Sequence, residues 1–301
     1  MRPHSLVVLF TITDDSLGAV TVRQSFQHLG LSQALAGSSL TTPLSLIFHF
    51  KKLFRQWSLN LAANNLMAIL DNHISKPGWR CDNDGGNGFF GDEYFNAGYM
   101  QHGAETVHSA NPNILVVFSG LNFDLDLSFL GNKSVNLSFT KKLVFEAHRY
   151  GFTDLAIWEG NDVNKACGIV RDDMTSKTGF LLDKGFPLFV SEFGMDERET
   201  NTNDNKFMNF FLSYAAELDF DWAIWALTGS YHIREGTTDM EEFDGLLNFD
   251  WSGVRNPGFL QRISTIQSPS KRMKAGKFQS AVTSFFSTYS VKNQEQPCPD
   301  H

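Results

Sequence analysis

The sequence predicts an α/β fold made of repeated strand and helix units. Short apolar runs rich in β-branched residues alternate with longer segments of helical periodicity. The runs are apolar on both faces, which is typical of parallel strands covered by helices. With 301 residues, of which 42% are hydrophobic, the chain is long enough for one α/β barrel of about 250 residues or two domains of about 150. Strands are predicted at 66–70, 114–118, 143–145, 187–190 and 222–225.

Two of the intervals between these strands carry apolar stripes with the spacing of one helix face. The first stripe consists of Met100, Ala104 and Val107. The second consists of Phe207, Phe210, Phe211, Tyr214 and Leu218. Gly185 follows a further helical segment and comes just before the strand at 187–190, where it is expected to end the helix. The repeating unit is therefore a helix, a short turn and a strand.

Charge and hydropathy exclude two classes of partner. The formal net charge is −8, and basic residues do not gather into a run interleaved with aromatic residues, so we expect no nucleic acid partner. No window reaches the roughly 18 consecutive apolar residues of a membrane span, so we expect no membrane partner. The short apolar run at 5–13 fits either a weak signal sequence or a buried strand.

Polar and aromatic side chains follow every predicted strand. In parallel α/β folds the functional groups lie just beyond the carboxyl ends of the strands. Residues at these positions include Asp71, His73, Asp124, Glu146, His148, Tyr150, Glu192 and Tyr231. Carboxylates, imidazoles and aromatic rings together are typical of glycoside hydrolysis, in which one carboxylate attacks the anomeric carbon and another group protonates the leaving oxygen.

Four of these strand ends resemble, in order, strands of glycoside hydrolase family 5, the cellulase-like glycosidases. The Ser-Glu-Phe-Gly segment at 191–194 is similar to the family's nucleophile strand. The segments at 71–73 and 148–150 resemble its third and sixth strands, and Trp225 with the residues up to Tyr231 resembles its eighth. The resemblance implies a (β/α)8 TIM-barrel glycosidase fold. It also implies a retaining hydrolase of β-linked polysaccharides or oligosaccharides that acts as a monomer without a cofactor or metal.

The resemblance further implies roles for individual residues. Glu192 would be the nucleophile, and Trp225 would be the platform on which a sugar ring stacks. The other expected substrate-binding residues, some of which also orient the nucleophile, are His73, Trp79, His148, Tyr150 and Tyr231.

The chain departs from the family pattern in the segment that should hold the acid/base residue. The family's fourth strand ends in Asn-Glu, and this sequence contains no such dipeptide. A helix and a strand are missing before residue 97, and the first two strands have no counterpart, so the barrel is expected to be incomplete. We expect a divergent N-terminal segment at 1–60, a family 5-like barrel at 61–267, and a linker with a poorly ordered tail at 268–301.

Several alternatives stay open on the sequence. Glu146 shares a strand face with His148 and is the best substitute acid in the chain, although the sequence favours a carboxylate that holds His148 or a neighbouring loop in place. The chain is then either an active hydrolase, or a non-catalytic relative or incomplete gene product without the acid. A metal-dependent barrel hydrolase using His73, His148 and a carboxylate is a third reading. Asp124, Glu159 and Glu197 are expected to be solvated loop charges.

The family resemblance also implies a secreted protein. Asn132 and Asn136 each begin a glycosylation sequon, which is meaningful only in the secretory route. In a secreted protein, Cys81 and Cys167 would be a plausible disulfide pair and Cys298 would be free.

Overall fold

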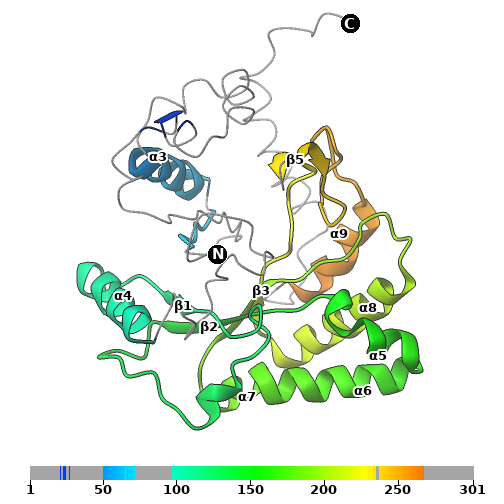
Figure 1. Ribbon diagram of the computed structural model, residues 1–301, viewed down its shortest axis with the longest axis horizontal. Coiled ribbons are helices and arrows are strands. Elements are labelled where there is room, and N and C mark those ends of the chain that lie inside the picture. The colour runs from blue at the N-terminus through cyan, green and yellow to red at the C-terminus, as the bar shows by residue number, and fades with distance from the viewer. Residues whose placement is uncertain are drawn as a thin grey trace, which may run out of the picture.

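A computed structural model describes residues 21, 23, 24, 27, 50–64, 66–71, 97–234 and 237–267. In this part of the chain the centre is a parallel sheet whose strands follow one another in sequence order (Figure 1). Its strands are β1 (Val116–Phe118), β2 (Leu143–His148), β3 (Leu188–Glu192) and β4 (Asp221–Trp222). A separate antiparallel hairpin consists of β5 (Ser230–Arg234) and β6 (Thr237–Glu241). Parallel neighbours in sequence order are the geometry of a strand and helix repeat.

Helices connect the strands and cover one face of the sheet. The α-helices are α3 (Phe50–Ala63), α4 (Ala97–Ala110), α5 (Leu155–Gly160), α6 (Val163–Met174), α7 (Phe180–Asp183), α8 (Thr202–Leu218) and α9 (Pro257–Ile263). Short 3-10 turns are η3 (Ser128–Gly131), η4 (Gly151–Asp154) and η6 (Ser264–Ile266), and η5 (Thr175–Gly179) is a π-helical turn between α6 and α7. Figure 1 shows α5, α6, α7 and α8 grouped on the same side of the sheet.

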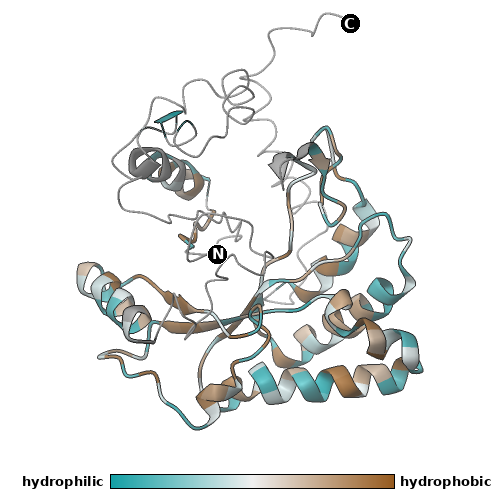
Figure 2. Cartoon of the chain, in the orientation of Figure 1, coloured by the Kyte–Doolittle hydropathy of each residue, from teal (hydrophilic) through white to brown (hydrophobic). Residues whose placement is uncertain are grey.

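The core lies between this face of the sheet and the helices. Phe145, Leu188 and Val190 are buried on the strands, and Trp158 and Phe211 are buried on the helices that face them. Figure 2 shows the strands mostly hydrophobic, whereas the covering helices carry both hydrophilic and hydrophobic residues. The pattern is that of amphipathic helices packed on a buried parallel sheet.

Most of the predicted elements are confirmed. The runs at 114–118, 143–145 and 187–190 form β1, β2 and β3, and the fourth strand is shorter than expected, at Asp221–Trp222. In the stripe on α8, Leu218 is half-buried and the four aromatic residues are buried. Gly185 ends the helix before β3 with a φ of 81°, a left-handed conformation that glycine adopts without steric cost.

Two predictions about the strands and helices are wrong. Residues 66–70 do not form a continuous strand, because Leu66 and Asp71 are isolated bridge residues and 67–70 between them have no regular structure. Val107 is exposed rather than part of the core stripe of α4, since this helix packs against the β1 edge, where Ala104 is the buried contact. No helix in the described ranges is long and apolar enough to cross a membrane.

Candidate active site

The carboxyl edge of the sheet brings Glu192 and His148 together. Both side chains are buried, and the distance from His148 Nδ1 to Glu192 Oε2 is 3.4 Å. Strands β2 and β3 pair in parallel, with Ala147 opposite Val190 and His148 opposite Glu192, so Ser191 is an extra residue on β3. Such a bulge changes the alternation of side chains and turns Glu192 to the same side as His148.

Tyr150 holds the same carboxylate oxygen. Its hydroxyl donates a hydrogen bond of 3.0 Å to Glu192 Oε2, and its ring stacks on Phe152 with a centroid distance of 4.8 Å. Two side chains from the end of β2 and the turn after it thus fix one oxygen of Glu192. These contacts constrain the orientation of the carboxylate.

Gly194 allows the chain after β3 to approach the backbone at Trp225 closely. A Cβ atom on this residue would lie 2.4 Å from the backbone oxygen of Trp225, which no side chain tolerates. The Trp225 amide in turn donates a hydrogen bond of 2.8 Å to the Phe193 oxygen. The glycine of the Ser-Glu-Phe-Gly segment therefore allows the chain after β3 to pack against the backbone at Trp225.

Asp124 is buried, so its expected role as a solvated loop charge was wrong. Its Oδ1 accepts a hydrogen bond of 2.7 Å from the Gly120 amide, and its Oδ2 lies 3.6 Å from His148 Nδ1. The His148 amide donates to the Asp124 backbone oxygen at 3.0 Å. His148 therefore lies between two buried carboxylates. The position of Asp124 after the strand β1 was the sequence signal for this role.

Glu146 is half-buried on β2, two residues before His148. Desolvation, together with the negative charges of Asp124, Asp71 and Glu192, raises the pKa of its carboxyl group from 4.5 to about 8. Glu146 is therefore protonated at neutral pH. The influence of Asp71 also places the end of the 66–71 segment near this edge of the sheet.

Trp225 and Tyr231 share a partner that the sequence did not reveal. The Trp225 indole nitrogen donates a hydrogen bond of 3.3 Å to Glu242 Oε2, and the Tyr231 hydroxyl donates to the same oxygen. The Asp244 amide binds the other oxygen of Glu242 at 3.1 Å. Glu242 is buried and follows a hairpin, 17 residues after Trp225 in the chain. No strand-end motif marked it, because only the return of the hairpin brings it to Trp225.

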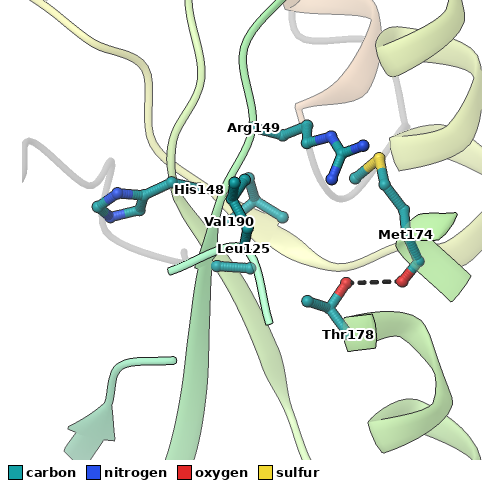
Figure 3. Close-up of a pocket in the computed structure, with 7 residues that line it drawn as sticks. Leu125, His148, Arg149, Met174, Thr178 and Val190 are labelled. Carbon is teal, nitrogen blue, oxygen red and sulfur yellow. Dashed lines mark hydrogen bonds between the residues drawn. The ribbon is translucent and has the colours of Figure 1, made fainter. Parts of the chain in front are cut away.

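Figure 3 shows that His148 and Arg149 project to opposite sides of β2. Arg149 is buried on the helix side, where it makes two hydrogen bonds to Asp154, at 2.9 and 2.7 Å, and an ion pair of 2.9 Å with Asp173. The gap drawn in Figure 3 has no room for a water molecule. It is a packing defect between the sheet and the helices, and the side chains for chemistry lie on the His148 side.

The remaining sequence expectations have mixed outcomes. His73 and Trp79 lie outside the described residues. Glu197 is buried, so its expected solvation was wrong, whereas Glu159 is exposed as expected. Cys167 is a half-buried free thiol on α6, and Cys81, its expected disulfide partner, lies outside the described residues. Burial raises the pKa of the Cys167 thiol, which makes it less reactive.

The parallel strands, joined by helices and with carboxylates at their carboxyl ends, place the chain in the class of α/β proteins. The family model of the cellulases, glycosyl hydrolase family 5, matches residues 95–230. A family 5 glycosyl hydrolase protein from Chamaecyparis obtusa is 38% identical over 305 aligned residues, which cover 86% of this chain and 54% of that protein. These matches identify residues 95–230 as a glycosyl hydrolase family 5 segment, and the chain spans about half the length of this relative.

A solved structure shows the fold. An endocellulase variant from Pyrococcus horikoshii in complex with cellotetraose has a TM-score of 0.50 at 15% identity, with 73% of this chain and 64% of that chain covered. The catalytic domain of the major endoglucanase from Xanthomonas campestris pv. campestris has a TM-score of 0.47 at 17% identity, with 70% and 62% covered. The predicted (β/α)8 fold is confirmed. The missing first strands and the missing strand and helix unit stay predictions.

Proposed function

We propose that the chain is a glycoside hydrolase that cleaves β-linked polysaccharides or oligosaccharides with retention of configuration, and that Glu192 is its nucleophile. The observation that carries this proposal is the fixed carboxylate of Glu192, held by Tyr150 and adjacent to His148 at the carboxyl edge of the sheet. A nucleophile must attack along a defined direction, and orienting it before the reaction lowers the entropic part of the barrier. The cellotetraose bound by the similar endocellulase supports a β-glucan substrate.

The proposed reaction has two steps. Glu192 attacks the anomeric carbon and forms a covalent glycosyl ester, while the oxygen of the leaving group takes a proton. Water then attacks the anomeric carbon and cleaves the ester, which frees the Glu192 carboxylate, and the water gives one proton back to the group that protonated the leaving oxygen. Glu146 is our candidate for the proton donor in the first step, because its pKa of about 8 keeps it protonated at neutral pH. In that role its carboxyl group would lie about 5–5.5 Å from that of Glu192.

The substrate would stack on Trp225. Sugar rings present apolar C–H faces that pack on aromatic rings, and an indole fixed in orientation loses little freedom on binding. Glu242 fixes this indole through its nitrogen, and it holds Tyr231 at the same time. We therefore assign Glu242 to the substrate platform together with Trp225 and Tyr231.

The test is hydrolysis of dinitrophenyl β-cellobioside and of cellotetraose by the wild type and by two variants. Glu192→Gln should abolish turnover of both substrates. Glu146→Gln should retain turnover of the dinitrophenyl glycoside, whose leaving group needs no proton, and should lose about 10²–10⁴-fold on cellotetraose. Glu159→Gln, at an exposed carboxylate on α5, is the matched control.

Unchanged turnover in Glu192→Gln would overturn the nucleophile assignment. Equal losses on both substrates in Glu146→Gln would overturn its role as the acid. An inactive wild type on both substrates would favour a non-catalytic relative.

We also propose that the protein is secreted and carries N-linked glycans. Asn132 and Asn136 are both exposed in the loop between η3 and β2, where a glycan can be added without disturbing the core. Expression through a secretory pathway should give a protein whose mass falls after treatment with an endoglycosidase, and the change should vanish in the Asn132→Gln, Asn136→Gln double variant. An unchanged mass in the wild type would contradict this proposal.

A further inference from the structure

An open hollow of about 440 Å3 lies beside the end of the β5 and β6 hairpin. Figure 1 shows this hairpin at the upper right, above α9. The hollow falls within the size range of small-molecule sites, about 300–1,000 Å3. Its lining consists of Glu241, Asn248, Phe249, Asp250, Ser252 and Arg255.

The hollow is on the opposite side of the hairpin end from the Trp225 platform. Glu241 is the last residue of β6, and its carboxylate pairs with Arg255 at 2.6 Å. Glu242, the next residue, binds Trp225 instead. Consecutive residues of an extended chain point to opposite faces, so the two carboxylates serve two separate sites.

The walls of the hollow are fixed before any ligand binds. The loop that carries Phe249 is closed by a bridge between Leu247 and Val254 and by a hydrogen bond of 2.9 Å from the Asn248 amide to the Gly253 oxygen. Arg255 is held by hydrogen bonds to the backbone oxygens of Leu247 and Glu242 at 3.2 and 3.1 Å. Because the loop is already ordered, it would lose little conformational entropy when a ligand binds.

The chemistry of the lining selects a neutral polyol. Phe249 is 46% exposed and offers an aromatic surface, while the carboxylates, the amide and the hydroxyl around it accept or donate hydrogen bonds. Glu241 neutralises Arg255, and hydrogen bonds from Ser252 hold the pKa of Asp250 below its usual value, so the lining carries a net negative charge. This charge disfavours acidic sugars and other anions.

We propose that this hollow is an accessory glycan site, which binds a neutral pyranose ring of a polysaccharide against Phe249. The inference draws on the proposed function for its class of ligand, and it adds a second point of attachment outside the Trp225 site. Such a site would raise affinity for long chains, because a second contact on one chain acts at high effective concentration. Short glycosides, which cannot reach both sites, would gain nothing from it.

The experiment is native electrophoresis of the full chain in gels that contain hydroxyethylcellulose. The wild type should be retarded. Phe249→Ala should raise the dissociation constant about tenfold, which is the loss of affinity typical of a central aromatic contact. Phe249→Trp keeps an aromatic surface and should restore the retardation. Leu155→Ala removes an exposed apolar side chain from α5 and is the matched control. Thermal unfolding of each variant shows that the fold is intact.

Three results would overturn the inference: no retardation of the wild type, equal retardation of Phe249→Ala and the wild type, or equal retardation in gels that contain the anionic polygalacturonate. Turnover of dinitrophenyl β-cellobioside separates this inference from the proposed function. Turnover that persists while Phe249→Ala changes nothing contradicts only the accessory site. Retardation that depends on Phe249 in a protein without turnover contradicts only the catalytic proposal.

Discussion

At the residue scale, the orientation of Glu192 depends on its neighbours. Tyr150 and His148 both contact its Oε2, and the bulge at Ser191 turns the side chain toward them. The local sequence shows a carboxylate after a strand, and only the pairing of β2 with β3 shows which way it faces. The hydroxyl of Tyr150 is the contact that can be removed with the least disturbance, since phenylalanine preserves the stacking on Phe152.

Tyr150→Phe should lower turnover of dinitrophenyl β-cellobioside about 10–100-fold, because a hydrogen bond to a charged group contributes about 1.5–3 kcal/mol. The measurement is kcat against that substrate. Tyr214→Phe removes a hydroxyl that bonds to Thr175 on the helix side of the sheet, and it should leave kcat unchanged. Equal kcat values for the two variants would show that Tyr150 does not orient Glu192, the proposed nucleophile.

At the element scale, Arg149 connects the end of β2 to the helical layer. It lies between His148 and Tyr150 in sequence, and its side chain reaches Asp154 at the end of η4 and Asp173 on α6. The Arg149 amide also donates to the Glu192 backbone oxygen at 3.0 Å. The strand end that carries two site residues is therefore anchored from the opposite face of the sheet.

Arg149→Met should lower the free energy of unfolding by about 3–5 kcal/mol, because it leaves two carboxylates without their buried cation. Arg171→Met breaks an ion pair with Glu217 in which both side chains are more than half exposed, and it should cost less than about 1 kcal/mol. Urea unfolding of both variants is the measurement. A similar small loss in both would mean that the Arg149 network adds no stability.

Secondary structure was the part of the fold best predicted from the sequence. Apolar runs and helical stripes are local patterns, and they located β1, β2, β3 and the buried face of α8. The exceptions have physical reasons. Val107 has the right spacing on α4, but it lies beyond the edge of the sheet that would cover it. Residues 66–70 have the composition of a strand, but in the 66–71 segment only Leu66 and Asp71 form bridges to another part of the chain.

At the scale of the whole molecule, two carboxyl groups that folding removes from water make stability depend on pH. Glu197 is buried, and neither of its oxygens has a hydrogen-bond partner among the described residues. Desolvation, followed by repulsion from Asp244 and Glu199, raises its pKa from 4.5 to about 9. The pKa of Glu146 is also raised, from 4.5 to about 8. The folded chain therefore binds more protons than the unfolded chain between about pH 5 and pH 9, and its stability falls as the pH rises through this window.

Glu197→Gln should remove much of this dependence. The difference in Tm, variant minus wild type, should increase by several degrees from pH 5 to pH 9. The expected size follows because 1 kcal/mol shifts Tm by about 2–4 °C in a domain of 150–250 residues. Thermal unfolding across this range is the measurement, and Glu159→Gln, at an exposed position, is the control. A constant difference at all pH values would mean that Glu197 is already ionised in the folded chain at pH 5.

The sequence by itself determined the order of the strand and helix units and the carboxylates that follow the strands, because both depend on local periodicity and on where each strand ends. Only the tertiary structure decided which of these groups work together. The bulge that turns Glu192 toward His148, the burial of Asp124 and Glu197, and the return of Glu242 to Trp225 all depend on residues far apart in the chain. Desolvation and the pairing of charges are properties of that packing, and a linear pattern of residue types does not contain them.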